Sequence, residues 1–293
     1  MKQIQITEKL LNDMRCISAN ENVLFQTTSG DVLKIMSRDY LYKYHLATGF
    51  SMEDKILSAK DIFNVPEIMV PKGALYLGNN FVGYFMDKAN GYSYVDYTNS
   101  FTVEEHKDLY KFAELYSAIE KPICEASDVV FPDLCTCDNI FIKPSQNGYN
   151  VQFIDYDGLQ VGKYQSLTIS TALGDYSQII KSKYLNSDGA FTKQLDIKSL
   201  IHLYFLTTFN IDLTKVGISY PGTNISVTLD DVFKCIGLED IDMMDKVYKV
   251  MYSNQPNEYL GDDVFRVADK YFMHAYPAPG MPNHYIKVLH KKR

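Results

Sequence analysis

The sequence changes character near Gly91, and this change constrains the fold more than any other feature. Before Gly91 the chain is rich in short β-type runs, whereas longer runs with helical spacing dominate after it. Strands gathered in the first third and helices in the remainder predict an α+β architecture. The polar segment at residues 87–91 ends in this glycine and is a candidate hinge. We therefore expect two domains, residues 1–88 and residues 89–293.

Two β-hairpins are predicted before the boundary. Residues 22–37 give two strands joined by a tight turn at Gly30, where glycine adopts a positive φ at little cost. Residues 73–86 give the second hairpin, GALYL and FVGYFM around the turn GNN. Between them, residues 51–63 have apolar side chains near helical spacing, with Ser51 as the N-cap. After the boundary we expect helices at 103–120 and 195–209, and short strands at 139–143 and 151–155.

The composition excludes several classes of protein. Of the 293 residues, 46% are hydrophobic and 22% are charged, which is typical of soluble globular chains and not of disordered or fibrous ones. A net charge of −7 argues against a broad nucleic-acid surface, so we expect no nucleic-acid partner. No apolar run is long enough to span a bilayer, and the N-terminus lacks a signal-peptide core. We expect a cytoplasmic protein without membrane insertion.

The cysteines indicate a reducing compartment. The five are odd in number and lack the regular spacing of a disulfide framework, so we expect free thiols. Cys135 and Cys137 have the spacing of half a metal or redox site, but no second cysteine pair or clustered histidines complete a tetrahedral set. We therefore assign no metal to these thiols.

Three short motifs carry chemistry-bearing residues in a fixed order. The first is VLKI at residues 32–35, which places Lys34 inside an apolar strand. By itself, such a lysine is most simply an edge-strand residue that points to solvent. The second is FPDLCTCDNIFI at residues 131–142, and the third is VQFIDYDG at residues 151–158, an apolar strand that ends in acidic residues and a glycine. The third motif places carboxylates at a rigid strand end.

Together these motifs resemble the protein-kinase-like superfamily, in a divergent form of the serine/threonine type. VLKI resembles the V-A-I-K strand, residues 131–142 resemble the H-R-D-L-x-x-x-N catalytic loop, and residues 151–158 resemble D-F-G with a substituted or inserted aspartate. The resemblance implies a two-lobed fold, with a small antiparallel-sheet N-lobe that has one main helix and a larger, mostly helical C-lobe. It also implies that ATP and Mg²⁺, or Mn²⁺, bind between the lobes.

The resemblance implies a role for each matching residue. Lys34 would contact the ATP phosphates, and Glu53 or, as second choice, Asp54 would hold its ammonium in place. Asn139 and Asp155 would bind the metal, because Mg²⁺ prefers hard oxygen ligands. Asp133 would orient the acceptor hydroxyl and accept its proton. The adenine would bind at the end of the second hairpin, with its contacts at Met86, Asp87, Lys88 and Ala89.

Several of these assignments have alternatives. Glu53 is also explained as a charge favoured at a helix N-terminus. Asp138 lies in the same loop as Asp133 and is an alternative acid, although turn formation explains it too. Asp157 fits a second metal ligand or a turn former ahead of Gly158. Asp196 resembles the buried aspartate that opens a long helix in protein kinases and anchors the catalytic-loop backbone, or it is a plain helix N-terminal charge.

The sequence also departs from the family pattern. Residues 16–23 contain no glycine where a glycine-rich phosphate loop belongs, so backbone N–H groups approach phosphates less closely. Phe131 and Pro132 replace the His-Arg pair, and the interval from Asp133 to Asn139 is one residue longer than in the family.

Four functional hypotheses follow from these observations. The leading one is an ATP- and Mg²⁺-dependent phosphotransferase that acts on a protein hydroxyl. The departures favour a second, a catalytically impaired pseudokinase that works as a nucleotide-binding or interaction scaffold. The sequence D-Y-D-G favours a third, a small-molecule kinase, and a helical interaction protein without nucleotide is the fourth.

Overall fold

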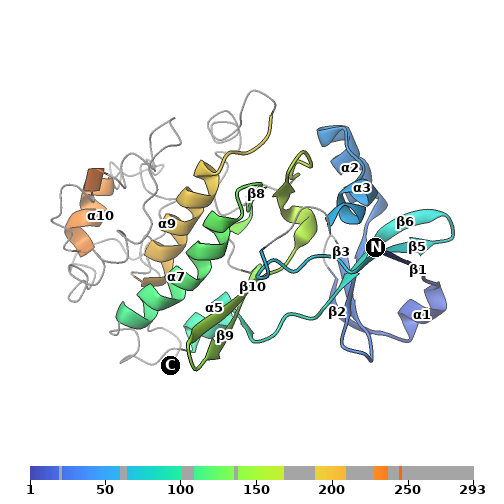
Figure 1. Ribbon diagram of the computed structural model, residues 1–293, viewed down its shortest axis with the longest axis horizontal. Coiled ribbons are helices and arrows are strands. Elements are labelled where there is room, and N and C mark those ends of the chain that lie inside the picture. The colour runs from blue at the N-terminus through green and yellow to red at the C-terminus, as the bar shows by residue number, and fades with distance from the viewer. Residues whose placement is uncertain are drawn as a thin grey trace, which may run out of the picture.

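The protein has an α+β architecture, as its sequence predicts (Figure 1). We describe it from a computed structural model, in which the described residues are 1–19, 22–59, 65–100, 109–134, 138–167, 189–208, 228–236 and 244–245. Cys135, Cys137 and residues 60–63 and 103–108 of the predicted helices lie outside these ranges. No helix within the described ranges is long and apolar enough to cross a membrane.

A six-stranded sheet contains both predicted hairpins. Its strand order is β1-β5-β6-β4-β3-β2. The strands are β1 (Lys2–Gln5), β2 (Arg15–Ala19), β3 (Asn22–Gln26), β4 (Val32–Met36), β5 (Gly73–Leu77) and β6 (Asn80–Met86). Gly30 and Gly78 have positive φ in the two hairpin turns, as the turn prediction requires. The hairpins β3–β4 and β5–β6 are thus confirmed.

The sheet is mixed, whereas the sequence led us to expect an antiparallel one. β1 pairs with β5 in parallel and forms one edge. A parallel pair needs a long crossover, and here β2, β3, β4 and three helices lie between the two strands in the chain. The first strand therefore extends the sheet in a direction that its own four residues do not reveal.

Among the described residues three helices accompany this sheet, where one main helix was expected. They are α1 (Glu8–Asn12), α2 (Arg38–Thr48) and α3 (Met52–Leu57). Ser37 caps α2 by accepting the N–H of Tyr40, and Gly49 ends it in a left-handed conformation. Ser51 caps α3 as predicted, by accepting the N–H of Asp54 at 3.4 Å. The turn at Gly49 divides one helical region into two short helices that pack against each other.

The remaining elements build two smaller sheets and a helical layer. One sheet has the order β10-β9-β7, and β11 pairs with β8. These elements are β7 (Tyr92–Ser93), α5 (Tyr94–Asn99), α7 (Leu109–Glu125), β8 (Val129–Val130), β9 (Ile140–Ser145), β10 (Gly148–Phe153), the 3₁₀ helix η2 (Tyr156–Gly158), β11 (Gln160–Val161), α9 (Gln194–Thr208) and α10 (Leu229–Ile236). Helices α7 and α9 lie side by side, next to the β9–β10 hairpin (Figure 1).

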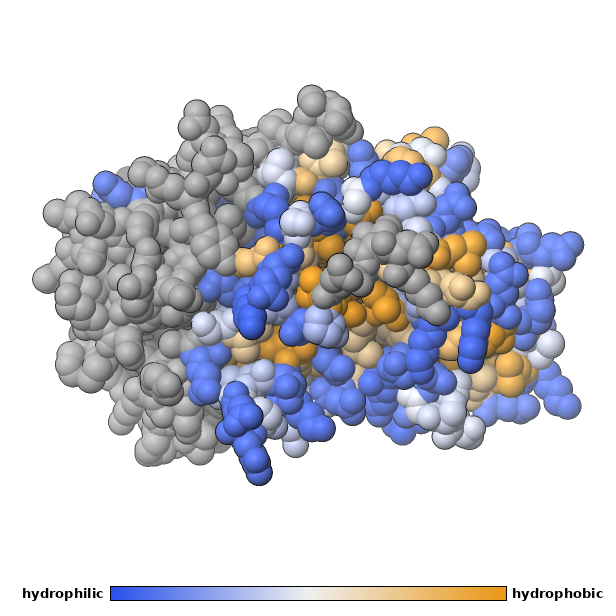
Figure 2. Space-filling view, in the orientation of Figure 1, coloured by the Kyte–Doolittle hydropathy of each residue, from blue (hydrophilic) through white to orange (hydrophobic). Residues whose placement is uncertain are grey.

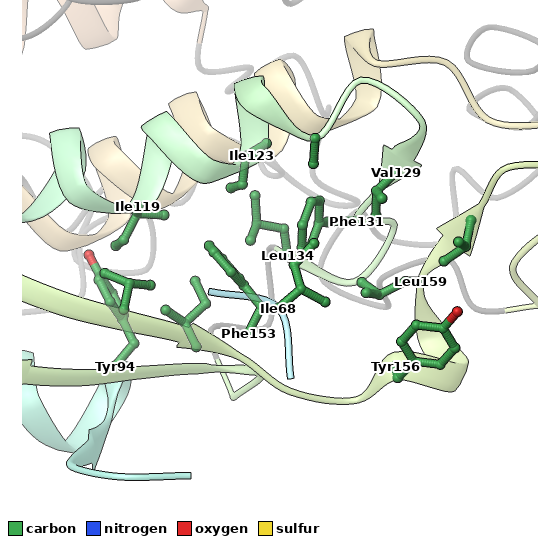
Figure 3. Close-up of a cluster of buried hydrophobic side chains, with 14 of the residues drawn as sticks. Ile68, Tyr94, Ile119, Ile123, Val129, Phe131, Leu134, Phe153, Tyr156 and Leu159 are labelled. Atoms are coloured by element: carbon green, nitrogen blue, oxygen red, sulfur yellow. The ribbon is translucent and has the colours of Figure 1, made fainter. Parts of the chain in front are cut away.

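Of the two buried hydrophobic clusters that the described ranges form, the larger contains residues of the six-stranded sheet and residues of the elements that follow it. In Figure 3, Phe131 and Phe153 lie against each other beneath Ile123 of α7, with ring centroids 4.9 Å apart. Residues 67–69 join β10 to the chain before β5, because the Phe153 N–H donates to the Glu67 carbonyl at 2.8 Å and the Phe153 carbonyl accepts the N–H of Met69 at 2.9 Å. This bridge fixes the end of β10 relative to the six-stranded sheet.

Residues 87–91 form a second connection, between β6 and β7. Gly91 has a φ of 100°, and a Cβ at this position would lie 2.2 Å from the Ile142 carbonyl oxygen, so only glycine fits. The Asn90 N–H donates to Gln152 at 2.7 Å. The predicted hinge segment is therefore held closely against the β9–β10 hairpin at its end.

Hydrophilic side chains cover much of the face over the six-stranded sheet, as Figure 2 shows.

Candidate functional site

Lys34 lies on a central strand and faces the core. β4 is hydrogen-bonded on one side to β3 and on the other to β6. Because side chains alternate along a strand, Lys34 shares its face with Val32 and Met36, which belong to the main core. Lys34 is buried. The solvent-facing interpretation of this lysine is therefore wrong, since β4 is not an edge strand.

The Lys34 ammonium is held by two aspartates. Its Nζ forms ion pairs with Asp155 and, at 2.7 Å, with Asp157 Oδ1. Burial opposes the charge on Lys34, but the attraction of Asp157 and Asp155 outweighs it and raises the pKa of Lys34 above its ordinary value. Lys34 is therefore a permanent cation, joined to the acidic end of the third motif.

Asp155 follows β10 in a constrained backbone conformation. Its φ is 67°, the only positive φ of a non-glycine residue in the described part of the chain. A Cβ at Gly158 would lie 2.6 Å from Asp155 Oδ2, so the glycine makes room for this carboxylate. The Asp155 side chain is 27% exposed. Such an outlier often occurs where a site requires a particular side-chain direction.

Asp157, two residues later, is buried and fully engaged. Its side chain is 1% exposed, and besides Lys34 it accepts hydrogen bonds from Tyr84 Oη at 2.7 Å and from Tyr40 Oη at 3.1 Å. Burial alone would raise its pKa, but the charge and hydrogen bond of Lys34, together with the hydrogen bond from Tyr84, lower the pKa of Asp157 below its ordinary value. Asp157 is therefore an ionised internal carboxylate and more than a turn former.

The β9–β10 hairpin brings Asn139 to the same place as Asp155. Asn139 directly precedes β9 and Asp155 follows β10, and the antiparallel pairing of these strands puts both residues at one end of the hairpin. The Ile154 N–H donates to the Asn139 carbonyl at 3.0 Å. Asn139 Nδ2 in turn donates to Asp133 Oδ2 at 3.3 Å. Asp138, the alternative acid, is exposed.

The predicted helix partner of Lys34 contacts another residue. Glu53 Oε1 accepts a hydrogen bond of 2.6 Å from Tyr76 Oη, while Lys34 has its ion pairs with Asp155 and Asp157. Glu53 lies in the first turn of α3, whereas the deeply buried positions of this short helix are Met52, Lys55 and Ile56. The helix phase therefore turns Lys55, and not Glu53, toward the third motif.

Lys55 joins α3 to the backbone of the third motif. Its fully buried Nζ donates to the carbonyl oxygens of Asp157, at 2.7 Å, and of Leu159. Loss of hydration is the largest influence on this group and lowers the pKa of Lys55 to about 7, although Asp157 and Asp155 oppose the shift. α3 thus fixes the position of residues 157–159 through a lysine.

Asp196 anchors the loop of the second motif. It is buried in the first turn of α9, and its Oδ1 accepts the N–H of Phe131 at 2.7 Å. Its Oδ2 accepts a hydrogen bond of 2.7 Å from Lys193, which also donates to the carbonyls of Ile123 and Val129. The expected contact between this aspartate and the backbone of the loop is therefore present.

Replacing Asp196 with alanine is expected to lower the free energy of unfolding by about 2 kcal/mol, because the buried Phe131 N–H loses its partner. Urea denaturation measures this change. Asp39→Ala, on the exposed surface of α2, is the control and should change stability by less than about 0.5 kcal/mol. Equal stabilities of the two variants would contradict the anchoring role.

The predicted adenine segment lies at the end of β6. Met86 is buried and pairs in register with Val32, so these two side chains are neighbours on the core face near Lys34. Asp87 and Lys88 are exposed and Ala89 is half-buried, in the connection that leaves the sheet. Asp87 forms an ion pair with Lys72. Lys34 of β4 pairs with Tyr84 of β6, and this segment begins two residues after Tyr84, at Met86.

Four residues of this site were not assigned a role in it from the sequence, or were assigned a lesser one: Tyr40, Lys55, Tyr84 and Asp157. Lys55 carried a usable signal, since a lysine beside Ile56 and between Met52 and Ala59 occupies the apolar face of a helix. The Ser37 and Gly49 caps likewise marked α2, the helix that carries Tyr40. No local pattern indicates that Tyr84 meets an aspartate far along the chain.

The donor set suits a Mg²⁺ ion that also binds phosphates. Asp155 offers a partly exposed carboxylate and Asn139 an amide at the same end of one hairpin. Mg²⁺ commonly uses one or two protein oxygens, with phosphates and waters as its other ligands. Among the described residues, no group of three or more His, Cys, Asp or Glu side chains forms an all-protein metal site. These residues fit a metal that arrives with a nucleotide better than a resident metal.

The chain matches no protein-family model, and a search of curated proteins found no significant match.

Proposed function

We propose that the protein is an ATP- and Mg²⁺-dependent phosphotransferase with a protein-kinase-like arrangement of its site. In this proposal residues 1–88 and 89–293 correspond to the two lobes, and the nucleotide binds between them. The acceptor is a hydroxyl group of a protein or a small molecule. Fold resemblance alone does not establish activity, so the proposal depends on the residues of the site.

The observation that carries the proposal is the partly buried ion pair between Lys34 and Asp155. It joins the first and third motifs, which are far apart in the sequence, and so places a candidate phosphate-binding lysine next to a candidate metal-binding aspartate. A buried cation and carboxylates are costly to desolvate and are often poor contributors to stability. Clusters of this kind are enriched at functional sites, which favours a functional explanation over a structural one.

The second motif supplies the group that acts on the acceptor. Asp133 is half-buried and contacts the side chain of Asn139, whereas Asp138 is exposed. This contact favours Asp133 as the carboxylate that orients the acceptor hydroxyl and accepts its proton. The Asp196 contact holds the start of the same loop in place. Asn139 and Asp155 would bind Mg²⁺, which supplies charge neutralisation at the phosphates when bound.

One observation favours the second candidate, a pseudokinase scaffold. Cys16, Ile17 and Ser18 belong to β2, and no glycine occurs there to bring backbone N–H groups close to a phosphate. Weaker positioning of the γ-phosphate would leave nucleotide binding intact and remove transfer. Binding and transfer must therefore be measured separately.

The experiment combines calorimetric titration of ATP with transfer of labelled γ-phosphate, to the protein itself and to a mixture of protein and small-molecule acceptors. We expect Mg²⁺-dependent ATP binding and transfer by the wild type. Asp155→Asn should lower transfer at least ~10²-fold, and Asp133→Asn should lower transfer while ATP still binds.

The other outcomes have distinct meanings. Binding without transfer would identify the pseudokinase, and the absence of both would exclude a nucleotide site altogether. Transfer that survives Asp133→Asn and is lost in Asp138→Asn would move the role of the acid to Asp138. The exposed substitution Asp39→Asn serves as the matched control for all of these variants.

A further inference from the structure

We propose that the Asp157 carboxylate is the group that positions the Lys34 ammonium, in the place of a glutamate from the neighbouring helix. The use of this ammonium for nucleotide phosphates rests on the function proposed above. The role of Asp157 in fixing Lys34 is a property of the protein alone. It can therefore be tested whether or not the chain transfers phosphate.

The two aspartates that contact Lys34 differ in burial. The Asp157 side chain is 1% exposed and that of Asp155 is 27% exposed. A ligand or metal can reach Asp155 from solvent, whereas Asp157 is enclosed. When Asp155 binds another partner, Asp157 remains as the counter-charge of Lys34.

Three hydrogen-bond donors surround the Asp157 carboxylate. Tyr84 Oη and Lys34 Nζ both lie 2.7 Å from its Oδ1, and Tyr40 Oη lies 3.1 Å from its Oδ2. These donors come from three different elements, β6, β4 and α2. Both carboxylate oxygens thus accept hydrogen bonds, which fixes the orientation of the group.

Helix α3 contacts the backbone of Asp157 and not Lys34 itself. In this chain its carboxylate Glu53 is hydrogen-bonded to Tyr76, and its buried cation Lys55 binds the backbone carbonyl of Asp157. The helix therefore acts on Lys34 indirectly, by holding the backbone that carries Asp157. A displacement of α3 would move Asp157 and, with it, the Lys34 ammonium.

The test compares Asp157→Asn, Glu53→Gln and the exposed control Asp39→Asn. The first readout is the rate at which an amine-acylating reagent modifies Lys34, followed by mass spectrometry. Asp157→Asn removes the buried carboxylate that holds the Lys34 ammonium in place, so we expect modification to become at least tenfold faster. Glu53→Gln and Asp39→Asn should stay within twofold of the wild type. An unchanged rate in Asp157→Asn, or an equal increase in Glu53→Gln, would overturn the proposal.

The second readout is ATP binding and turnover. Asp157→Asn should weaken ATP binding at least tenfold both with Mg²⁺ and with a chelator, because its effect passes through Lys34. Asp155→Asn should weaken mainly the component of ATP binding that depends on Mg²⁺. If the wild type binds no ATP, the proposed function fails, and the acylation rates still decide the role of Asp157. If Asp157→Asn does not fold, Tyr84→Phe replaces it and should give a smaller increase in acylation, with no increase contradicting the proposal.

Discussion

Lys34→Met is expected to reduce phosphate transfer by ~10²-fold to ~10³-fold and to lower the free energy of unfolding by about 3 to 5 kcal/mol. The loss of activity follows from the removal of the cation proposed to contact the phosphates. The loss of stability follows because Asp157 is buried beside Asp155 and both lose their common counter-charge. Removing one partner of a buried ion pair costs far more than the pair itself contributes.

The pH dependence of this variant separates the electrostatic cause from a packing defect. Protonation of the two aspartates at low pH removes their repulsion, so the stability difference between wild type and Lys34→Met should become smaller as the pH falls from 7 to about 4. Chemical denaturation at several pH values measures this difference. Lys43→Met, on the exposed side of α2, is the control and should have little effect. A deficit that is independent of pH would indicate lost packing.

Lys55 is expected to make the stability of the protein rise between about pH 7 and pH 10. Burial lowers the pKa of Lys55 to about 7 in the folded state, whereas the unfolded chain keeps the ordinary value of 10.5. Between these two values the unfolded state binds more protons than the folded state, so stability rises with pH by up to about 1.4 kcal/mol per unit. Below pH 7 both states hold the proton, and the contribution of Lys55 no longer changes.

The measurement is the difference in unfolding free energy between wild type and Lys55→Met at each pH. Groups that titrate in both proteins cancel in this difference. Lys34 adds no slope in this range, because its folded pKa is raised above 10.5 and its contribution changes only above that value. The free energy of unfolding of the wild type should increase relative to that of the variant as the pH rises from 7 to 10. Parallel curves would show that Lys55 keeps its ordinary pKa in the folded protein.

The sequence predicted the elements whose signals are local. Both hairpins of the six-stranded sheet, the Ser51 cap of α3 and the helix that begins near Asp196 occur where alternation, turn glycines and helical spacing placed them. The parallel edge strand β1 and the division into α2 and α3 were not predicted. A strand of four residues contains no information about its direction in a sheet, because that depends on the connection to its partner.

The same distinction applies to the site. Lys34, Asn139 and Asp155 were identified from the sequence because the motifs that contain them resemble those of the protein-kinase-like superfamily, and each residue lies in or next to an apolar strand. The sequence thus determined the candidate residues of the proposed nucleotide site and their order along the chain. Their partners depended on distances across the fold, which local patterns do not contain.

The tertiary structure decided which charges meet. In the structure Lys34 forms an ion pair with Asp157. Glu53 accepts a hydrogen bond from Tyr76, and Lys55 donates to the backbone carbonyl of Asp157. Glu53 and Lys55 are two residues apart in this helix and so lie on nearly opposite faces, about 200° apart around the axis. The rotation of the helix about its axis therefore decides whether the carboxylate or the ammonium faces the third motif. Only the packing of α3 against the sheet fixes that rotation, and for this reason the sequence named the residues of the site while the structure assigned their contacts.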